Sequence, residues 1–366
     1  MSISYTVRAP GKLMIAGEYA ILEPNQRAVV IAINRYVTVC IEEAKTNKIS
    51  IPQWGIEDIS WEIVNETVEF STRDSRLIFV ENSIYIVYKF LKEKGIKTKS
   101  FKLLIESELN DPLSGKKYGL GSSAAVVVTI IESILRLHSD NNNVFTLDKI
   151  FKLSAIVHLI TQKNGSGADI AAAVYGGWLE YSAFSGEWVL NEFEQGGKIL
   201  DILDKSWPNL YIKSLTPPPS LQLVVGWTKE PASTAAMVKT VQDFGKYNLE
   251  VYNEFLRGSS ISVSRLIKSF ENKDSTEAII SLSQNRKVLK KLGENTGINI
   301  ETMKLRKLCS IADTFGSGKL SGAGGGDCGI AFLLGDSQKQ EIFKIWKEAD
   351  IMPLDLRVSK MGVSIQ

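Results

Sequence analysis

The sequence predicts an α+β protein with two domains that share a cleft. The chain has 366 residues, more than the roughly 250–300 at which a single hydrophobic core stops growing. Hydrophobic residues make up 44% of it and charged residues 23%, a balance typical of globular proteins that excludes a disordered chain. The predicted strands and helices follow one another in runs, without the regular βαβ repeat of a Rossmann fold.

The individual elements follow from the spacing of the apolar side chains. Short apolar or alternating stretches bounded by glycine, proline or asparagine predict strands. In chain order they cover residues 4–8, 28–41, 61–64, 101–105, 178–181, 221–227 and 330–334. Longer stretches with a 3.6-residue repeat predict helices. These cover residues 77–94, 124–137, 147–160, 168–174, 234–241, 249–270, 276–291 and 300–314.

A domain boundary is expected where this pattern weakens, around residues 195–220. The segment Thr-Pro-Pro-Pro-Ser at 216–220 lies in that region. Proline fixes φ and restricts the residue before it, so the segment should be an extended connection. We therefore expect an N-terminal domain over residues 1–203 and a C-terminal domain over residues 204–366.

The composition excludes several partners and compartments. The net charge is +2. A charge this small does not indicate binding to nucleic acid or to an acidic membrane surface. The three cysteines, Cys40, Cys309 and Cys328, are far apart, which indicates neither a disulfide framework nor a zinc site. No stretch resembles a signal peptide or approaches the roughly 18–20 apolar residues of a membrane span. We expect a cytoplasmic protein.

The most informative segment is Gly-Leu-Gly-Ser-Ser-Ala-Ala at residues 119–125, which leads directly into an apolar helix. Glycines let a backbone approach a ligand, and the N–H groups of a helix N-terminus favour anions. The segment matches neither a Walker A loop nor a dinucleotide fingerprint. It could be a simple helix cap, but Lys116 and Lys117 just upstream add cations and favour a phosphate site.

Three further segments contain candidate site residues. Residues 321–329 hold five glycines in nine positions, a density normally found where a backbone bends tightly or touches a ligand. Lys12 follows a Pro-Gly pair just after the first strand, where a solvated lysine would also be ordinary. Asp169 falls in the first turn of a short helix, where it could simply stabilise the helix N-terminus.

Together, in this order and at this spacing, the four segments resemble the GHMP small-molecule kinases, the superfamily of galactokinase, homoserine kinase and mevalonate kinase. The resemblance extends from Ala9 to Gly329. Within the superfamily, the sequence most resembles the bacterial phosphomevalonate kinases. Mevalonate kinases usually carry His where Tyr19 stands, and a metal-binding Glu where this chain has His158. These departures argue against a mevalonate kinase and leave the second protein ligand to Mg²⁺ open.

The resemblance implies a fold, cofactors and a set of site residues. The implied N-terminal domain is like ribosomal protein S5 domain 2, the C-terminal domain is ferredoxin-like, and ATP and Mg²⁺ bind between them. Lys12 would face the transferring phosphoryl group, with Asp169 as base or orienting group. Nucleotide binding is expected from Lys116, Gly119, Leu120, Gly121, Ser122, Ser123, Ala124 and Asn82, with Ser123 also on the metal. Acceptor binding is expected from Lys12, Tyr19, Asn164, Ser166, Ser233, Gly324, Gly325 and, unless it lies on a solvated helix face, Arg286.

The expected reaction is transfer of phosphate from ATP to (R)-5-phosphomevalonate, in the mevalonate route to isoprenoids. The alternatives are another GHMP kinase acting on an alcohol such as mevalonate, or a non-catalytic sensor with the same fold. The presence of both Lys12 and Asp169 argues against a sensor. The expected partners are these small molecules, in a monomer or homodimer.

Overall fold

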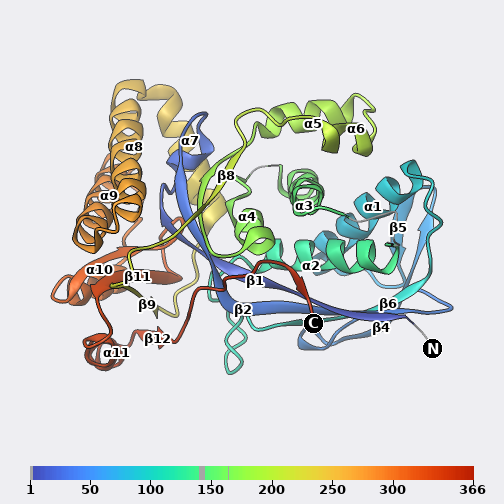
Figure 1. Cartoon of the computed structure of the whole chain (residues 1–366), viewed down its shortest axis with the longest axis horizontal. Helices are drawn as coiled ribbons and strands as arrows, with labels where there is room; N and C mark the ends of the chain where they lie inside the picture. The colour runs from blue at the N-terminus through green and yellow to red at the C-terminus, as the bar shows by residue number, and fades with distance from the viewer. Residues whose placement is uncertain (1–2, 140–144, 164) are drawn as a thin grey trace.

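The chain forms two β-sheets, each with helices packed against it (Figure 1). The structure, a computed structural model, describes residues 3–139, 145–163 and 165–366. Strands and helices are mixed in both halves, so the predicted α+β class with two domains is confirmed.

The larger sheet has the strand order β13-β1-β2-β6-β3-β4-β5; β7 pairs with the first residues of β2, and β8 pairs with β7. Its strands are β1 (Ser4–Ala16), β2 (Ala28–Glu43), β3 (Lys48–Ile51), β4 (Ile56–Val64), β5 (Thr67–Phe70), β6 (Phe101–Ser107), β7 (Trp178–Ser182), β8 (Tyr211–Leu215) and β13 (Ser364–Ile365). Strand β1 continues past the predicted residues 4–8 because its pairing with β2 resumes after a shift between Pro10 and Gly11. This extension brings Lys12 into the sheet.

Helices cover one face of the larger sheet (Figure 1). They are α1 (Ile78–Glu93), α2 (Ser122–Leu137) and α4 (Ala168–Tyr175), and α3 (Leu147–Gln162) packs on these three helices. Helix α2 packs on β1 and β2, and most of its side chains are buried. Two short helices, α5 (Gly186–Glu194) and α6 (Ile199–Asp204), contact α3 from outside. Three single-turn helices, η1 (Ala20–Leu22), η2 (Pro52–Trp54) and η3 (Ser75–Leu77), complete this part.

The smaller sheet has the order β10-β11-β9-β12. Its strands are β9 (Leu221–Trp227), β10 (Gly316–Leu320), β11 (Cys328–Leu334) and β12 (Met352–Leu354). The helices of this part are α7 (Thr234–Tyr247), α8 (Leu249–Glu271), α9 (Ser275–Thr296), α10 (Met303–Ala312) and α11 (Lys339–Glu348). Strand β11 is buried along its length up to Leu334, which places it at the centre of the core. Within the described ranges, none of the helices combines the length and apolar character that crossing a bilayer requires.

The chain passes between the two sheets more than once. Strand β8 pairs with β7 of the larger sheet, although it follows residue 203. At the end of the chain, β13 returns to pair with β1. The predicted division between residues 203 and 204 therefore does not coincide with the division between the sheets, because strand pairing between distant segments overrides the order of the chain.

Candidate active site

The predicted phosphate loop leads into α2 without a side-chain cap. The residue before the helix is Gly121, whose φ of 77° lies in the left-handed region that favours glycine. Ser122 and Ser123 occupy the first helical turn, and among the described residues their hydroxyls have no hydrogen-bond partner. The first N–H groups of the helix and two hydroxyls are therefore available to an anion. This geometry favours the phosphate site over a simple cap.

Lys12 lies directly against this loop. Its backbone N–H donates to the carbonyl oxygen of Leu120 at 2.8 Å. The approach requires glycine on both sides: a methyl group at Gly11 would lie 2.7 Å from that same oxygen, and one at Gly121 would lie 2.9 Å from Lys12 Cγ. The same point above Gly121 is 3.5 Å from Asp169 Cβ. The side chains of Lys12 and Asp169 thus meet over the start of α2.

Asp169 is placed by the first turn of α4. That helix also begins after a left-handed glycine, Gly167, with a φ of 74° and no side-chain cap. Asp169 Oδ1 accepts a hydrogen bond from the Ile170 N–H at 3.0 Å. The hydroxyl of the fully buried Tyr181 donates to the Ser166 carbonyl oxygen at 2.5 Å and so fixes the turn before the helix. Asp169 therefore sits on a rigid support.

His158, on α3, lies beside these groups. Its side chain is 7% exposed, and within the described part of the chain its Nε2 has no hydrogen-bond partner. Burial lowers the pKa of the imidazole, while the charge of Asp169 and a hydrogen bond with the Ser123 backbone act in the opposite direction. A neutral imidazole, and not a carboxylate that could bind Mg²⁺, therefore stands beside Asp169.

The second glycine-rich segment bends for two different reasons. A methyl group at Gly322 would lie 3.9 Å from Lys12 Nζ, so this glycine faces the site. One at Gly324 would lie 2.1 Å from the Ile300 carbonyl oxygen, and one at Gly325 would lie 2.6 Å from Met237 Sδ. The last two glycines thus allow close packing within the C-terminal part. Their density reflects internal packing as well as the cavity.

Three side-chain interactions fasten this segment and the end of β10 just before it to the N-terminal part. Ser321 Oγ donates to the Met14 carbonyl oxygen at 2.8 Å, and the Tyr19 hydroxyl donates to the Ala323 carbonyl oxygen at 2.5 Å. The third is a buried ion pair between Lys319 Nζ and Glu18 Oε1. We call these three interactions the seam.

The Lys319–Glu18 pair is almost completely removed from solvent. Lys319 is 0% exposed and Glu18 3%. Lys319 Nζ also donates to the Leu320 carbonyl oxygen at 2.7 Å, whereas no described residue pairs with Glu18 Oε2. Burial lowers the pKa of Lys319, and Glu18 opposes that effect. Neither charge could be left buried without the other.

Asp327 crosses from the C-terminal part to the phosphate loop. Its N–H donates to the Glu230 carbonyl oxygen at 2.7 Å, and its own carbonyl oxygen accepts from Thr228. A methyl group at Gly119 would lie 2.5 Å from Asp327 Oδ2. Burial raises the pKa of the Asp327 carboxyl group, while the Ala232 N–H, Lys12 and Lys117 act against this rise.

One cavity of about 1130 Å³ is lined by Lys12, Asp169, His158 and Asp327. Its volume is of the size of small-molecule sites, roughly 300–1,000 Å³. Both halves of the chain line it. The predicted site residues on its wall are Lys12, Tyr19, Lys116, Gly119, Gly121, Ser122, Ser123, Ser166, Asp169 and Gly324.

Other predicted residues lie elsewhere. Leu120 and Ala124 are buried in the core behind the loop. Ser233 and Gly325 adjoin wall residues without lining the cavity themselves, and Asn164 lies outside the described residues.

Two predicted side chains are already paired with protein groups. Asn82 Nδ2 donates to Thr161 Oγ1 at 2.8 Å. The guanidinium of Arg286 forms ion pairs with Glu301 at 2.8 Å and Asp313 at 2.6 Å. Neither residue lines the cavity. Contacts of Asn82 with a nucleotide and of Arg286 with an acceptor would each compete with these pairs.

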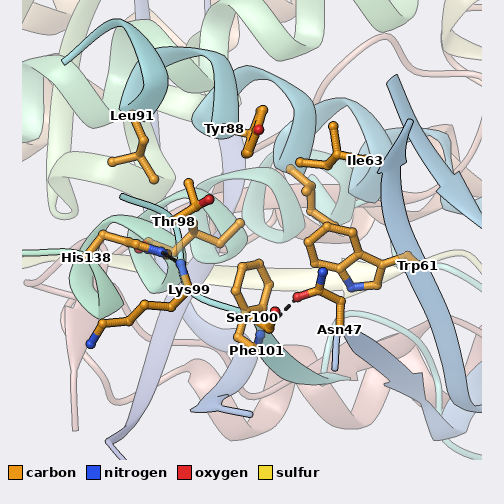
Figure 2. Close-up of a pocket in the computed structure, with 12 residues that line it drawn as sticks. Asn47, Trp61, Ile63, Tyr88, Leu91, Thr98, Lys99, Ser100, Phe101 and His138 are labelled. Carbon is orange, nitrogen blue, oxygen red and sulfur yellow. Dashed lines mark hydrogen bonds between the residues drawn. The ribbon is translucent and has the colours of Figure 1, made fainter. Parts of the chain in front are cut away.

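A second pocket lies near the other end of α2 (Figure 2). Trp61, Tyr88 and His138 are among its lining residues. Its edges are fixed by hydrogen bonds from the Lys99 N–H to His138 Nε2 and from the Phe101 N–H to Asn47 Oδ1, drawn as dashed lines. Its volume is about 80 Å³, too small for a nucleotide, and it includes none of the predicted site residues.

Several residues of the large cavity were not predicted as site residues. Asp327 is in the second glycine-rich segment, where a charged side chain among glycines was an available signal. Helix α5 contributes Glu187, Leu190, Asn191 and Glu194 to the wall. No motif marks these four, because they reach the cavity only through the packing of α5 on α3.

Comparison with known proteins gives consistent matches over the chain. The family described as GHMP kinases N terminal domain matches residues 82–177, and GHMP kinases C terminal matches residues 266–351. Phosphomevalonate kinase of Streptomyces sp. strain CL190 is 30% identical, covering 97% of each chain.

Two solved structures are similar over nearly their whole length. A Listeria innocua protein, Lin0012, matches with a TM-score of 0.92 and 36% identity, covering 100% of this chain and 99% of the other. Streptococcus pneumoniae phosphomevalonate kinase in complex with phosphomevalonate and AMPPNP matches with a TM-score of 0.84 and 28% identity, covering 97% and 99%.

Proposed function

This chain belongs to the GHMP kinases, and from that membership we propose that it transfers the γ-phosphoryl group of ATP to (R)-5-phosphomevalonate. One structural observation carries the chemical part of the proposal. The side chains of Lys12 and Asp169 meet over Gly121 at the start of α2, on the wall of a cavity lined by both halves. The acceptor is inferred from the similarity to phosphomevalonate kinases along the chain.

The nucleotide phosphates fit the N-terminus of α2. The N–H groups of the first turn and the hydroxyls of Ser122 and Ser123 are donors without partners among the described residues. Lys116 adds a cation on the same wall. Such donors favour the charge that develops on a transferring phosphoryl group.

Mg²⁺ would neutralise part of the phosphate charge when it is bound. The residues present fit this ion, because it is bound by oxygen atoms and Ser123 offers a hydroxyl in the first helical turn. We infer that Ser123 binds it. His158 presents nitrogen atoms, which Mg²⁺ does not prefer.

The acceptor would lie between Asp169 and the second glycine-rich segment. Lys12 Nζ, close to Gly322, would contact the transferring phosphoryl group and stabilise its charge. The acceptor is itself a phosphate, whose second pKa is about 6, so its attacking oxygen is already anionic near neutral pH. Asp169 would then mainly orient that oxygen and accept the remaining proton when the phosphate is singly ionised.

A coupled assay of ADP release tests the proposal. The acceptors are phosphomevalonate, mevalonate, galactose and homoserine, with an acceptor-free reaction as the control for ATP hydrolysis. We expect ADP release with phosphomevalonate and only background release with the other three. Activity with mevalonate alone would contradict the proposed acceptor and leave the phosphoryl-transfer assignment intact.

A further inference from the structure

Asp327 places a carboxylate against the phosphate loop, where polyphosphate would repel it. Gly119 leaves room for this carboxylate, since a methyl group there would lie 2.5 Å from Oδ2. Asp327 reaches the loop from the opposite half of the chain with a φ of 54°. Aspartate and asparagine tolerate this left-handed conformation better than most residues. The backbone is therefore shaped to present this particular side chain.

The charge of Asp327 is not cancelled by a direct ion pair. Among the described residues, none of the cations lies within ion-pair distance of its carboxylate, although Lys12 and Lys117 are near enough to affect its pKa. The side chain is only partly buried and lines the large cavity. With ATP bound, this carboxylate would lie beside the phosphates and weaken binding, because the Ala232 N–H and the two lysines offset only part of its burial. A divalent cation between them would turn this repulsion into attraction.

The other groups near the loop do not supply such a carboxylate at this place. Ser122 and Ser123 offer neutral hydroxyls. His158 offers nitrogen atoms and is buried beside the Ser123 backbone. Mg²⁺ is a hard cation that is usually held by one or two carboxylates together with the substrate phosphates. Asp169, the other carboxylate near the loop, lies over Gly121 beside Lys12 and is assigned to the acceptor. Asp327 therefore remains to supply a carboxylate next to Gly119.

We propose that Asp327 binds the Mg²⁺ that accompanies ATP, together with Ser123. This inference rests on the proposed use of ATP. It also gives the metal a structural consequence, because an ion held by Ser123 and Asp327 joins the two halves of the chain across the cavity. With the metal present, residues from both halves of the chain would thus contribute to nucleotide binding through the ion; without the metal, Asp327 would make no such contribution.

Calorimetric titration with AMPPNP, with Mg²⁺ and with EDTA, tests this proposal. The variant Asp327→Asn keeps the left-handed backbone and the size of the side chain while removing its charge. We expect it to reduce the affinity for AMPPNP in Mg²⁺ by at least about tenfold, the lower range for disturbed metal sites. In EDTA its affinity should equal or exceed that of the wild type, because a repulsive charge has been removed.

A matched control is Asp355→Asn, which removes an exposed carboxylate paired with Lys339 at 2.9 Å. It should behave as the wild type in both buffers. Equal loss of AMPPNP affinity with and without Mg²⁺ in Asp327→Asn would overturn the proposal, since that pattern indicates a role in placing Lys12 or in folding. Unchanged affinity in both buffers would overturn it as well.

Electron paramagnetic resonance of Mn²⁺ added to the protein–AMPPNP complex gives a second measurement. Asp327→Ser, a smaller neutral variant, should bind Mn²⁺ in that complex at least about tenfold more weakly than the wild type. Equal Mn²⁺ binding would contradict the assignment. Neither measurement uses the acceptor, so a failure of phosphomevalonate to be phosphorylated would leave this test unaffected.

Discussion

At the scale of single residues, Lys12 connects the most parts of the site. Its backbone N–H holds the phosphate loop through Leu120, its stem crosses Gly121, and its Nζ reaches toward Gly322. A single lysine therefore lies between the proposed donor and acceptor phosphates. Asp169 is the adjoining carboxylate on a fixed helical turn.

We predict that Lys12→Ala lowers kcat at least as much as Asp169→Asn does. Loss of Lys12 removes charge stabilisation in the transition state, whereas an acceptor phosphate that is already ionised needs little base catalysis. The Asp169→Asn variant should lose no more than the roughly 10²–10⁴-fold typical of a general base. Steady-state kinetics at saturating ATP and phosphomevalonate measures both values.

Lys12→Arg is the matched control, because it keeps the positive charge and changes its shape. It should retain more activity than Lys12→Ala. A kcat for Lys12→Ala equal to that of the wild type would remove Lys12 from the proposed mechanism.

At the scale of elements, α2 combines the phosphate site with an unusually buried helix. Two of its buried polar side chains are satisfied within the helix, as Thr129 donates to the Ala125 carbonyl oxygen and Ser133 donates to the Thr129 carbonyl oxygen. Glu132 is different: burial raises its pKa to about 7, with Arg136 as a partial counterweight. A titrating carboxyl group is thus built into the helix that positions the loop.

This pKa predicts a pH-dependent effect of Glu132→Gln on stability. The pKa of Glu132 in the folded chain lies above the ordinary value of 4.5. The stability of the folded chain is therefore highest, as far as Glu132 is concerned, below about pH 4.5, where this group is protonated. This contribution of Glu132 is lost as the pH rises through about 7. At pH 8 the free energy of unfolding of the variant should therefore exceed that of the wild type by about 1–3 kcal/mol.

At pH 5 the two proteins should differ little, because Glu132 is then mostly protonated in the folded chain. Urea unfolding of both proteins at the two pH values measures the difference. The same difference at pH 5 and pH 8 would show that Glu132 does not titrate in this range.

The elements also show what local pattern can predict. The helices over 147–160 and 249–270 were predicted within a few residues, since each has a long 3.6-residue repeat. Strands β3, β5, β8, β10, β12 and β13 and helices α5, α6 and α11 were missed. These are short, and their stability comes from pairing or packing with segments distant in the chain, which local periodicity does not report.

The same distinction applies to the site. The phosphate loop, Lys12 and Asp169 lie in segments whose glycines and order along the chain identified them. The meeting of Gly119 with Asp327 depends instead on how the two halves pack. The pairing of Arg286 with Glu301 and Asp313 likewise became visible only in the fold.

At the scale of the whole molecule, the seam holds the two halves in one arrangement. Its ion pair is the most buried part, because Lys319 is 0% exposed. The seam begins at Met14 and ends at Tyr19, a few residues after Lys12. A change at the seam should therefore affect the geometry of the catalytic lysine as well as stability.

We predict that Lys319→Met lowers the free energy of unfolding by about 3–5 kcal/mol, the usual range for leaving one buried charge unpaired. The double variant Lys319→Met with Glu18→Gln should recover part of this loss, because no charge then remains unpaired. Urea unfolding of the wild type, both single variants and the double variant gives the coupling energy.

The surface pair Lys246–Asp243, at 2.8 Å, provides a control. Lys246→Met should change stability far less, since exposed pairs contribute little. Additive effects of the two seam substitutions would contradict a direct interaction between Lys319 and Glu18.

The pairing of Val7 with Ile365 has a consequence for biosynthesis. Strand β1 leaves the ribosome early, yet its edge partner β13 is made only after the small sheet and its helices have been translated. Contacts between such distant segments form slowly. During translation the edge of β1 at Val7 and Arg8 is therefore open to pairing with other strands until β13 has been made. The strand that carries Lys12 thus reaches its final surroundings only after the small sheet has been translated.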